Sequence, residues 1–211
     1  RDEKITSLGQ ERPGWASLSR GEWLTLFQNS GLAELDSSGE PLHSKIVSSL
    51  HSEIDTLILN GCESEPYLTS DHALMMSHPV EILKGAEILR TIYGAKRIIF
   101  ALEENKLEVA ELLKSKIYFL KWKHAEVHVL PSIYPAGSEA VLRHELLGID
   151  FQTLAAIKNG GVETGARIHN VATAFAVYEA AVLQKPFYER AVTVGGECTV
   201  EPKNLWLRMG T

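Results

Sequence analysis

The chain has 211 residues, of which 45% are apolar and 23% charged, and its net charge is −6. This length and composition are typical of a globular protein that buries a full core in one domain, or in one domain with a small appendage. The negative net charge argues against a generic nucleic-acid binder.

Cys62 and Cys198 are the only cysteines. Two cysteines make no disulfide framework, which favours a reducing compartment, and they are too few to ligate an iron–sulfur cluster. No apolar run approaches the roughly 20 residues that a membrane span needs, and no signal peptide opens the chain. Because the sequence begins at Arg1 rather than Met, we expect it to be a piece of a longer protein.

Local signals in chain order predict an irregular lead-in over residues 1–18, followed by alternating helices and strands. Ser19 and Glu22 match a capping box, and Pro79 and Asn105 stand at two further helix starts. The predicted helices cover residues 20–31, 43–50, 79–93, 105–116, 138–147 and 171–183, and the predicted strands cover 54–59, 97–102, 127–130, 167–170, 189–194 and 204–209. This alternation predicts an α/β fold with a mostly parallel sheet and right-handed crossovers.

The chemistry of the chain is concentrated where an apolar strand ends in a polar stretch, residues 60–71. Asn60 and Gly61 are expected to turn the chain because both tolerate positive φ, and the carboxylates of Glu63 and Glu65 follow. Ligands of open α/β sheets bind beyond the carboxyl ends of the strands, so this loop is a candidate binding site. The alternative is a solvated turn between strand and helix.

Two further polar loops, residues 131–138 and 170–173, follow other predicted strands and should converge with the first at one edge of the sheet. The helix that begins at Ser138 either holds a phosphate at its amino end or is an ordinary capped helix. We expect Glu63 and Glu65 to accept hydrogen bonds from a ligand rather than to act as an acid–base pair. No glycine-rich nucleotide fingerprint and no HExxH metal motif is present.

Several of these stretches resemble one known family. Residues 60–71 resemble the N-A-A-E-C-E-P-Y-x-T-x-D stretch of the RnfC family, the C subunit of the Rnf electron-transport complex, and more distantly the flavin subunit of respiratory complex I. Residues 134–137 resemble the family's Y-P-S-G, and residues 169–177 its Q-N-V-G-T-A-Y-A-V. Residues 189–194 and 204–211 resemble the ends of the same domain.

The resemblance implies a three-layer α/β/α fold with a Rossmann-like sheet, which binds FMN and oxidises NADH. It implies that residues 51–211 form this domain, and that residues 1–50 are a lead-in, a helix and a degenerate glycine-loop region. The implied cofactor-binding residues are Lys45, Asn60, Glu63, Ser64, Glu65, Tyr134, Gly137, Asn170 and Thr173. No residue is implied to be catalytic in itself, and none to bind a metal.

The family's glycine-rich loop, G-G-A-G-F-P-T-x-x-K, corresponds here to residues 36–45, where only Gly39, Pro41 and Lys45 are retained. Asp36 and Glu40 place side chains and negative charge where a phosphate would approach the backbone. This departure leaves an alternative open, a degenerate RnfC-like scaffold or docking domain that has lost flavin binding.

The resemblance also implies partners and a location. These are other subunits of an electron-transport complex, no nucleic acid, and a cytoplasmic position, peripheral to the inner membrane and attached through those subunits. The family's 4Fe–4S clusters would belong to a segment outside this chain.

Overall fold

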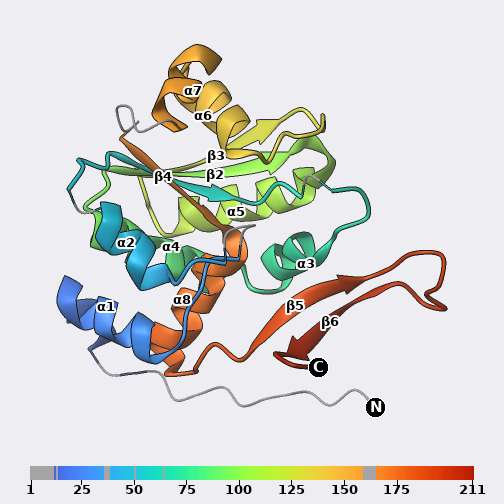
Figure 1. Ribbon diagram of the computed structural model, residues 1–211, viewed down its shortest axis with the longest axis horizontal. Coiled ribbons are helices and arrows are strands. Elements are labelled where there is room, and N and C mark those ends of the chain that lie inside the picture. Colours follow the sequence, from blue (N-terminus) through green and yellow to red (C-terminus); the bar gives the residue numbers. More distant parts are fainter. Residues whose placement is uncertain (1–11, 13, 36–38, 50, 64, 159–164) are drawn as a thin grey trace.

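The computed structural model describes residues 12, 14–35, 39–49, 51–63, 65–158 and 165–211. Its centre is a four-stranded parallel sheet in the order β3-β2-β1-β4 (Figure 1). The strands are β1 (Thr56–Asn60), β2 (Arg97–Glu103), β3 (Ala125–Leu130) and β4 (Ala166–Asn170). The near-continuous aliphatic runs of the two central strands, β1 and β2, suit strands that are covered on both faces.

Helices cover both faces of this sheet, so the predicted three-layer α/β/α fold is confirmed (Figure 1). On one face lie α4 (Pro79–Tyr93), α5 (Leu107–Phe119) and α8 (Val171–Leu183), with α1 (Arg20–Asn29) and α2 (Leu42–Ser49) beyond them. On the other face lies α6 (Glu139–Leu147), against which α7 (Phe151–Lys158) packs.

Alternate residues of the central strands β1 and β2 enter two separate cores. Leu57 and Leu59 of β1 belong to the larger core, together with Trp23 and Phe27 of α1. Ile58 points to the opposite face and belongs to a smaller core under α6. The described part of the first fifty residues therefore shares a core with the sheet, and the domain boundary predicted at residue 50 stays a prediction.

The capping box predicted at the start of α1 is confirmed. The Ser19 hydroxyl accepts a hydrogen bond from the Glu22 amide, and the Glu22 carboxylate accepts one from the Ser19 amide at 2.8 Å. Gly31 follows the helix with φ of 69°, in the left-handed conformation expected of a terminating glycine.

The strands predicted at the end of the chain form, but outside the parallel sheet. Strands β5 (Glu189–Val194) and β6 (Lys203–Arg208) pair with each other in an antiparallel hairpin (Figure 1). Apart from the buried Glu189, the residues of β5 are half-exposed or exposed, as in a ribbon with one open face. An interpretation that counted this strand in the parallel sheet was therefore wrong.

Several helices differ from the predicted pattern. Asn105 was expected to cap a helix, but a 3-10 turn (Glu104–Lys106) comes first and α5 begins at Leu107. The Asn105 side chain instead accepts a hydrogen bond from Lys106 Nζ at 3.2 Å. Helix α3 (Ser70–Ser77) was not predicted, and it begins inside the candidate binding loop.

Candidate functional site

A cavity of about 610 Å³ opens at the carboxyl edge of the parallel sheet. The loops that follow β1 and β3 line it, as the sequence predicted, together with the carboxyl end of β4. The predicted third loop, residues 170–173, does not form, because β4 ends at Asn170 and α8 begins at Val171. Six of the predicted site residues are among the lining residues, namely Asn60, Glu63, Glu65, Tyr134, Gly137 and Asn170. Ser64 lies outside the described residues.

Asn60 joins two of these loops at the end of β1. Its Nδ2 donates a hydrogen bond to the Gly137 carbonyl at 2.9 Å, and its Oδ1 accepts one from the Cys62 amide at 3.0 Å. The side chain thus holds the loop after β3 against the loop after β1. Each amide atom keeps capacity for one further hydrogen bond, which a ligand could use.

Asn170 plays the same part at the end of β4. Its Oδ1 accepts from the Ala172 amide at 2.6 Å and caps α8, and its Nδ2 donates to Asp71 Oδ2 at 2.7 Å. Strand β4 is thereby tied to α3, the helix that carries Asp71.

Gly61 is required for a reason other than the one the sequence suggested. Neither Asn60 nor Gly61 has a positive φ; the non-glycine residue in this loop that does is Tyr67, at 70°. A Cβ on Gly61 would lie 2.6 Å from Leu102 Cδ2 and 2.9 Å from Met75 Sδ. The glycine therefore serves close packing beneath the cavity rather than a turn.

Carboxylates and one lysine are buried below the cavity. Lys106 Nζ lies 2.6 Å from Glu103 Oε2 and 3.7 Å from Glu63 Oε2, and all three side chains are at most 6% exposed. Glu63 Oε1 accepts from the Asp71 amide at 2.7 Å, while Oε2 forms no hydrogen bond within the described part of the chain. Burial raises the pKa of Glu63 to about 7.

This pKa makes the stability of the protein depend on pH. The folded chain holds the Glu63 proton up to about pH 7, whereas an ordinary glutamate loses it near 4.5. Stability should therefore fall as pH rises between these values, by up to about 3 kcal/mol. The free energy of unfolding of Glu63→Gln, measured with urea, should equal that of the parent at pH 5 and exceed it at pH 8. The exposed control Glu111→Gln should have the free energy of unfolding of the parent at both pH values. If the free energies of unfolding of the parent and Glu63→Gln changed with pH in the same way, Glu63 would not be the cause of the pH dependence.

Cys62, also at the cavity, is an unreactive thiol. It is 6% exposed, and its Sγ lies 3.6 Å from the Ala101 carbonyl. Burial raises the pKa of this thiol to about 12, with a smaller contribution from Glu103. Burial therefore disfavours the thiolate and with it a nucleophilic role.

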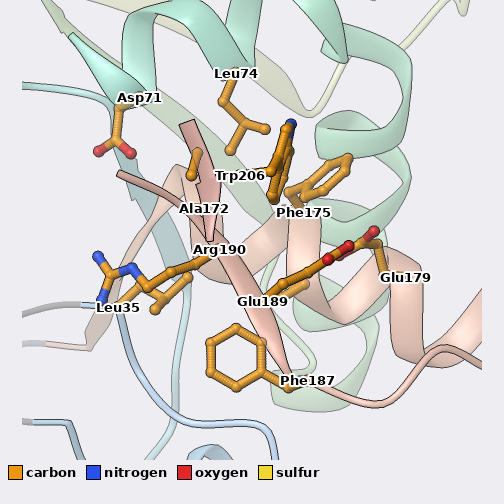
Figure 2. A pocket seen from close by; sticks show the side chains of 12 residues that line it. Leu35, Asp71, Leu74, Ala172, Phe175, Glu179, Phe187, Glu189, Arg190 and Trp206 are labelled. Carbon is orange, nitrogen blue, oxygen red and sulfur yellow. The ribbon is translucent and has the colours of Figure 1, made fainter. Parts of the chain in front are cut away.

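Arg190 is the cavity residue that sequence reasoning missed. It is the only lysine or arginine among the described residues that line the cavity. It comes from β5, and its charge opposes the rise in the pKa of Asp71 that burial causes. Figure 2 shows Arg190 and Asp71 on one side of this strand. The arginine lies 119 positions after Asp71 in the sequence, so only the docking of the hairpin brings the two together.

The docking of that hairpin rests on a buried ion cluster and on hydrogen bonds to the binding loop. Lys185 Nζ lies 2.5 Å from Glu179 of α8 and 2.7 Å from Glu189 of β5. Figure 2 shows these two carboxylates close together, on the side away from Asp71. The Thr69 amide donates to Thr193 Oγ1 at 3.1 Å. These contacts hold Arg190 at the cavity.

Lys45 and Thr173 do not line the cavity. Both contact Glu34, which is 2% exposed: Lys45 Nζ lies 3.6 Å from Glu34 Oε2, and Thr173 Oγ1 donates to the same oxygen at 3.3 Å. Glu34 also pairs with His169, whose Nε2 lies 2.8 Å from the Tyr93 hydroxyl. This buried chain holds the segment before the degenerate glycine loop against β4 and α8.

The described segments contain neither a candidate cluster of metal ligands nor a helix that could cross a membrane. No group of three or more histidine, cysteine or carboxylate side chains there could hold a metal ion. None of the helices in these segments is long and apolar enough to cross a bilayer.

The model of the Nuo51 FMN-binding domain matches residues 27–179. The chain belongs to this family. It is 36% identical over 206 residues to the C subunit of the ion-translocating oxidoreductase complex of Erwinia tasmaniensis, covering 96% of this chain and 24% of that protein. It is 30% identical over 213 residues to the C subunit of the proton-translocating ferredoxin:NAD(+) oxidoreductase complex of Clostridium ljungdahlii, covering 100% of this chain and 44% of that protein.

These matches confirm the resemblance to RnfC proteins, although the chain spans less than half the length of these relatives. Among solved structures, an NAD+-reducing [NiFe]-hydrogenase in its air-oxidized state superimposes with a TM-score of 0.76 at 19% identity. This superposition covers 94% of this chain and 38% of the hydrogenase chain, and at this identity it supports the fold alone.

Proposed function

We propose that this chain is the flavin-binding domain of an electron-transfer subunit of an ion-translocating oxidoreductase complex, and that it binds FMN and oxidises NADH. The observation that carries the proposal is the cavity at the carboxyl edge of the sheet. Six of the residues that line it are ones that the resemblance implies to bind the cofactor. Membership of an FMN-binding domain family supports the same ligand.

The size and polarity of the cavity fit the ring and sugar chain of a flavin. Ligand pockets of about 300–1,000 Å³ are usual for molecules of this size. Flavin and ribityl groups carry N–H and O–H donors, and Glu63 Oε2 is a buried acceptor without a hydrogen-bond partner in the described chain. Tyr134 is 73% exposed at the cavity, where its ring can stack on a planar ligand.

A cation at the cavity could hold the phosphate of FMN, and Arg190 is the residue we assign to it. Glu63, Glu65, Asp71 and Glu139 all line the cavity and would repel a phosphate. Lys45, which the resemblance implies to be a cofactor-binding residue, is paired with Glu34 instead. A guanidinium can hold a phosphate through two parallel hydrogen bonds.

Bound FMN would supply the two-electron chemistry that accepts hydride from NADH. The protein contributes binding and orientation: Asn60 and Asn170 fix the loops, and the Glu63–Lys106–Glu103 cluster sets the charge beneath the ligand. The carboxylates at the rim can accept hydrogen bonds from the ribose hydroxyls of a nicotinamide nucleotide. The electrons would leave through other subunits of the complex. We propose that this chain lies beside those subunits, in a peripheral position on the cytoplasmic face of the membrane.

A second candidate is a scaffold domain that has lost flavin binding. The excess of carboxylates over cations at the cavity favours it, as does the use of Lys45 in an internal ion pair. The two candidates differ in a direct test of ligand binding.

Tyr134→Ala should lower the affinity for FMN about tenfold, because one stacking contact contributes roughly 1–3 kcal/mol. Quenching of flavin fluorescence measures this affinity. The matched control is Tyr118→Ala, since Tyr118 is 81% exposed at the opposite edge of the sheet. Equal FMN affinity for the parent and Tyr134→Ala would exclude stacking by this residue, and absence of binding by the parent would favour the scaffold.

A further inference from the structure

Exposed aromatic and basic side chains gather where helix α5 ends and strand β3 begins. Tyr118 and Phe119 are 81% and 75% exposed, and their ring centroids lie 6.1 Å apart. The neighbouring Leu120 is 45% exposed. We define the α5 patch as Lys114, Lys116, Tyr118, Phe119, Leu120, Lys121 and Lys123.

The charge of the α5 patch is opposite to that of the chain as a whole. Residues 112–125 contain four lysines and no acidic residue, in a chain of net charge −6. Lys114 pairs with Glu111 at 2.9 Å, whereas no described residue forms an ion pair with Lys116, Lys121 or Lys123. Lysines near the end of a helix interact favourably with its dipole, but this does not account for the exposed rings beside them.

The rings are exposed because the opposite face of α5 already fills the core. Val109, Leu113 and Ile117 are buried there at the helical spacing of four residues. Trp122 turns back and stacks on His124, with ring centroids 5.2 Å apart. Neighbouring exposed apolar side chains on a folded domain commonly mark a contact surface.

We propose that the α5 patch binds the surface of an anionic lipid bilayer. Aromatic rings favour the interface between headgroups and acyl chains, and lysines extend their charges to anionic headgroups. A short segment that interleaves lysines with exposed rings has the composition of an interfacial anchor. This contact is separate from any attachment through partner subunits, and it does not depend on flavin binding.

The position of the α5 patch allows both contacts at once. In a parallel sheet all strands begin at one edge, and the patch immediately precedes β3 (Ala125–Leu130). The cavity lies at the other edge, beyond the strands' carboxyl ends. Binding to a bilayer at the amino edge would therefore leave the cavity open to its ligands.

Cosedimentation of the chain with lipid vesicles tests the proposal. We expect binding to vesicles that contain phosphatidylglycerol, weakened by added salt, and little binding to vesicles of phosphatidylcholine alone. Replacing Lys116, Lys121 and Lys123 with Gln should lower the partition coefficient roughly a hundredfold, at about fivefold for each lysine. Replacing Tyr118 and Phe119 with Ser should lower it about tenfold.

A second triple variant, with Arg20, Lys203 and Arg208 replaced by Gln, changes the net charge equally at exposed positions away from the α5 patch. It should keep most of the binding. All these residues are on the surface, and urea unfolding verifies that each variant is folded. The proposal is overturned if neither vesicle binds the chain, or if the control triple loses as much binding as the patch triple. Either result would exclude specific binding of an anionic bilayer by the α5 patch.

Discussion

Replacing Gly85 with Ala is expected to destabilise the fold by about 3 kcal/mol or more, through forced overpacking of two helices. Gly85 lies in the buried face of α4, where a Cβ would come within 1.8 Å of the Ala174 carbonyl oxygen of α8. That oxygen belongs to the backbone, so no side-chain rotation relieves the overlap. The two helices must separate, which opens the larger core along their contact.

Urea unfolding measures this change, with Gly21→Ala as the matched control. Gly21 lies in α1, where an added Cβ would have no neighbouring atom within 4 Å, so that substitution should be neutral or stabilise by up to about 1 kcal/mol. Recovery of Gly85→Ala only as aggregate, with Gly21→Ala folded, agrees with the expectation. A Gly85→Ala protein as stable as the parent would show that α4 and α8 are not held this close.

Replacing Arg190 with Gln is expected to weaken FMN binding between about 10-fold and 100-fold, because hydrogen bonds to charged groups contribute roughly 1.5–3 kcal/mol. Riboflavin has the same ring and sugar chain without the phosphate. Its affinity should therefore change little. Fluorescence titration of both flavins measures the two affinities on the same protein.

The comparison separates two roles for Arg190. Arg208→Gln, an exposed change on the same hairpin, serves as the control and should bind both flavins as the parent does. An equal loss of FMN and riboflavin affinity in Arg190→Gln would mean that the arginine acts through Asp71 and the hairpin, not through the phosphate. Unchanged FMN affinity would contradict the assignment altogether.

The sequence predicted the parts of the fold that local signals determine. Ser19 and Glu22 form the expected capping box, and Pro79 and Gly94 stand at the expected ends of α4. The loops after β1 and β3 and the end of β4 converge on one cavity because parallel strands share a carboxyl edge. That geometry follows from topology, so it could be predicted without side-chain detail.

The remaining features depend on contacts between distant residues. The sequence of β5 predicts a strand but not its partner, and hence not that Arg190 reaches the cavity. Glu34 is an isolated acid in the sequence, yet it pairs with Lys45 and His169 in the structure. The exposed rings of Tyr118 and Phe119 look like ordinary core residues of a helix until the buried face of α5 is known.

The most direct test of flavin binding is a titration of the chain with FMN, followed by flavin fluorescence. It should be repeated with a variant that restores the glycine-rich loop, Asp36→Gly with Ser37→Gly and Glu40→Phe. The account predicts saturable binding of one FMN by the parent, and reduction of the bound flavin by NADH. No change in fluorescence with the parent, even when the restored variant binds, would contradict it and identify the domain as a scaffold.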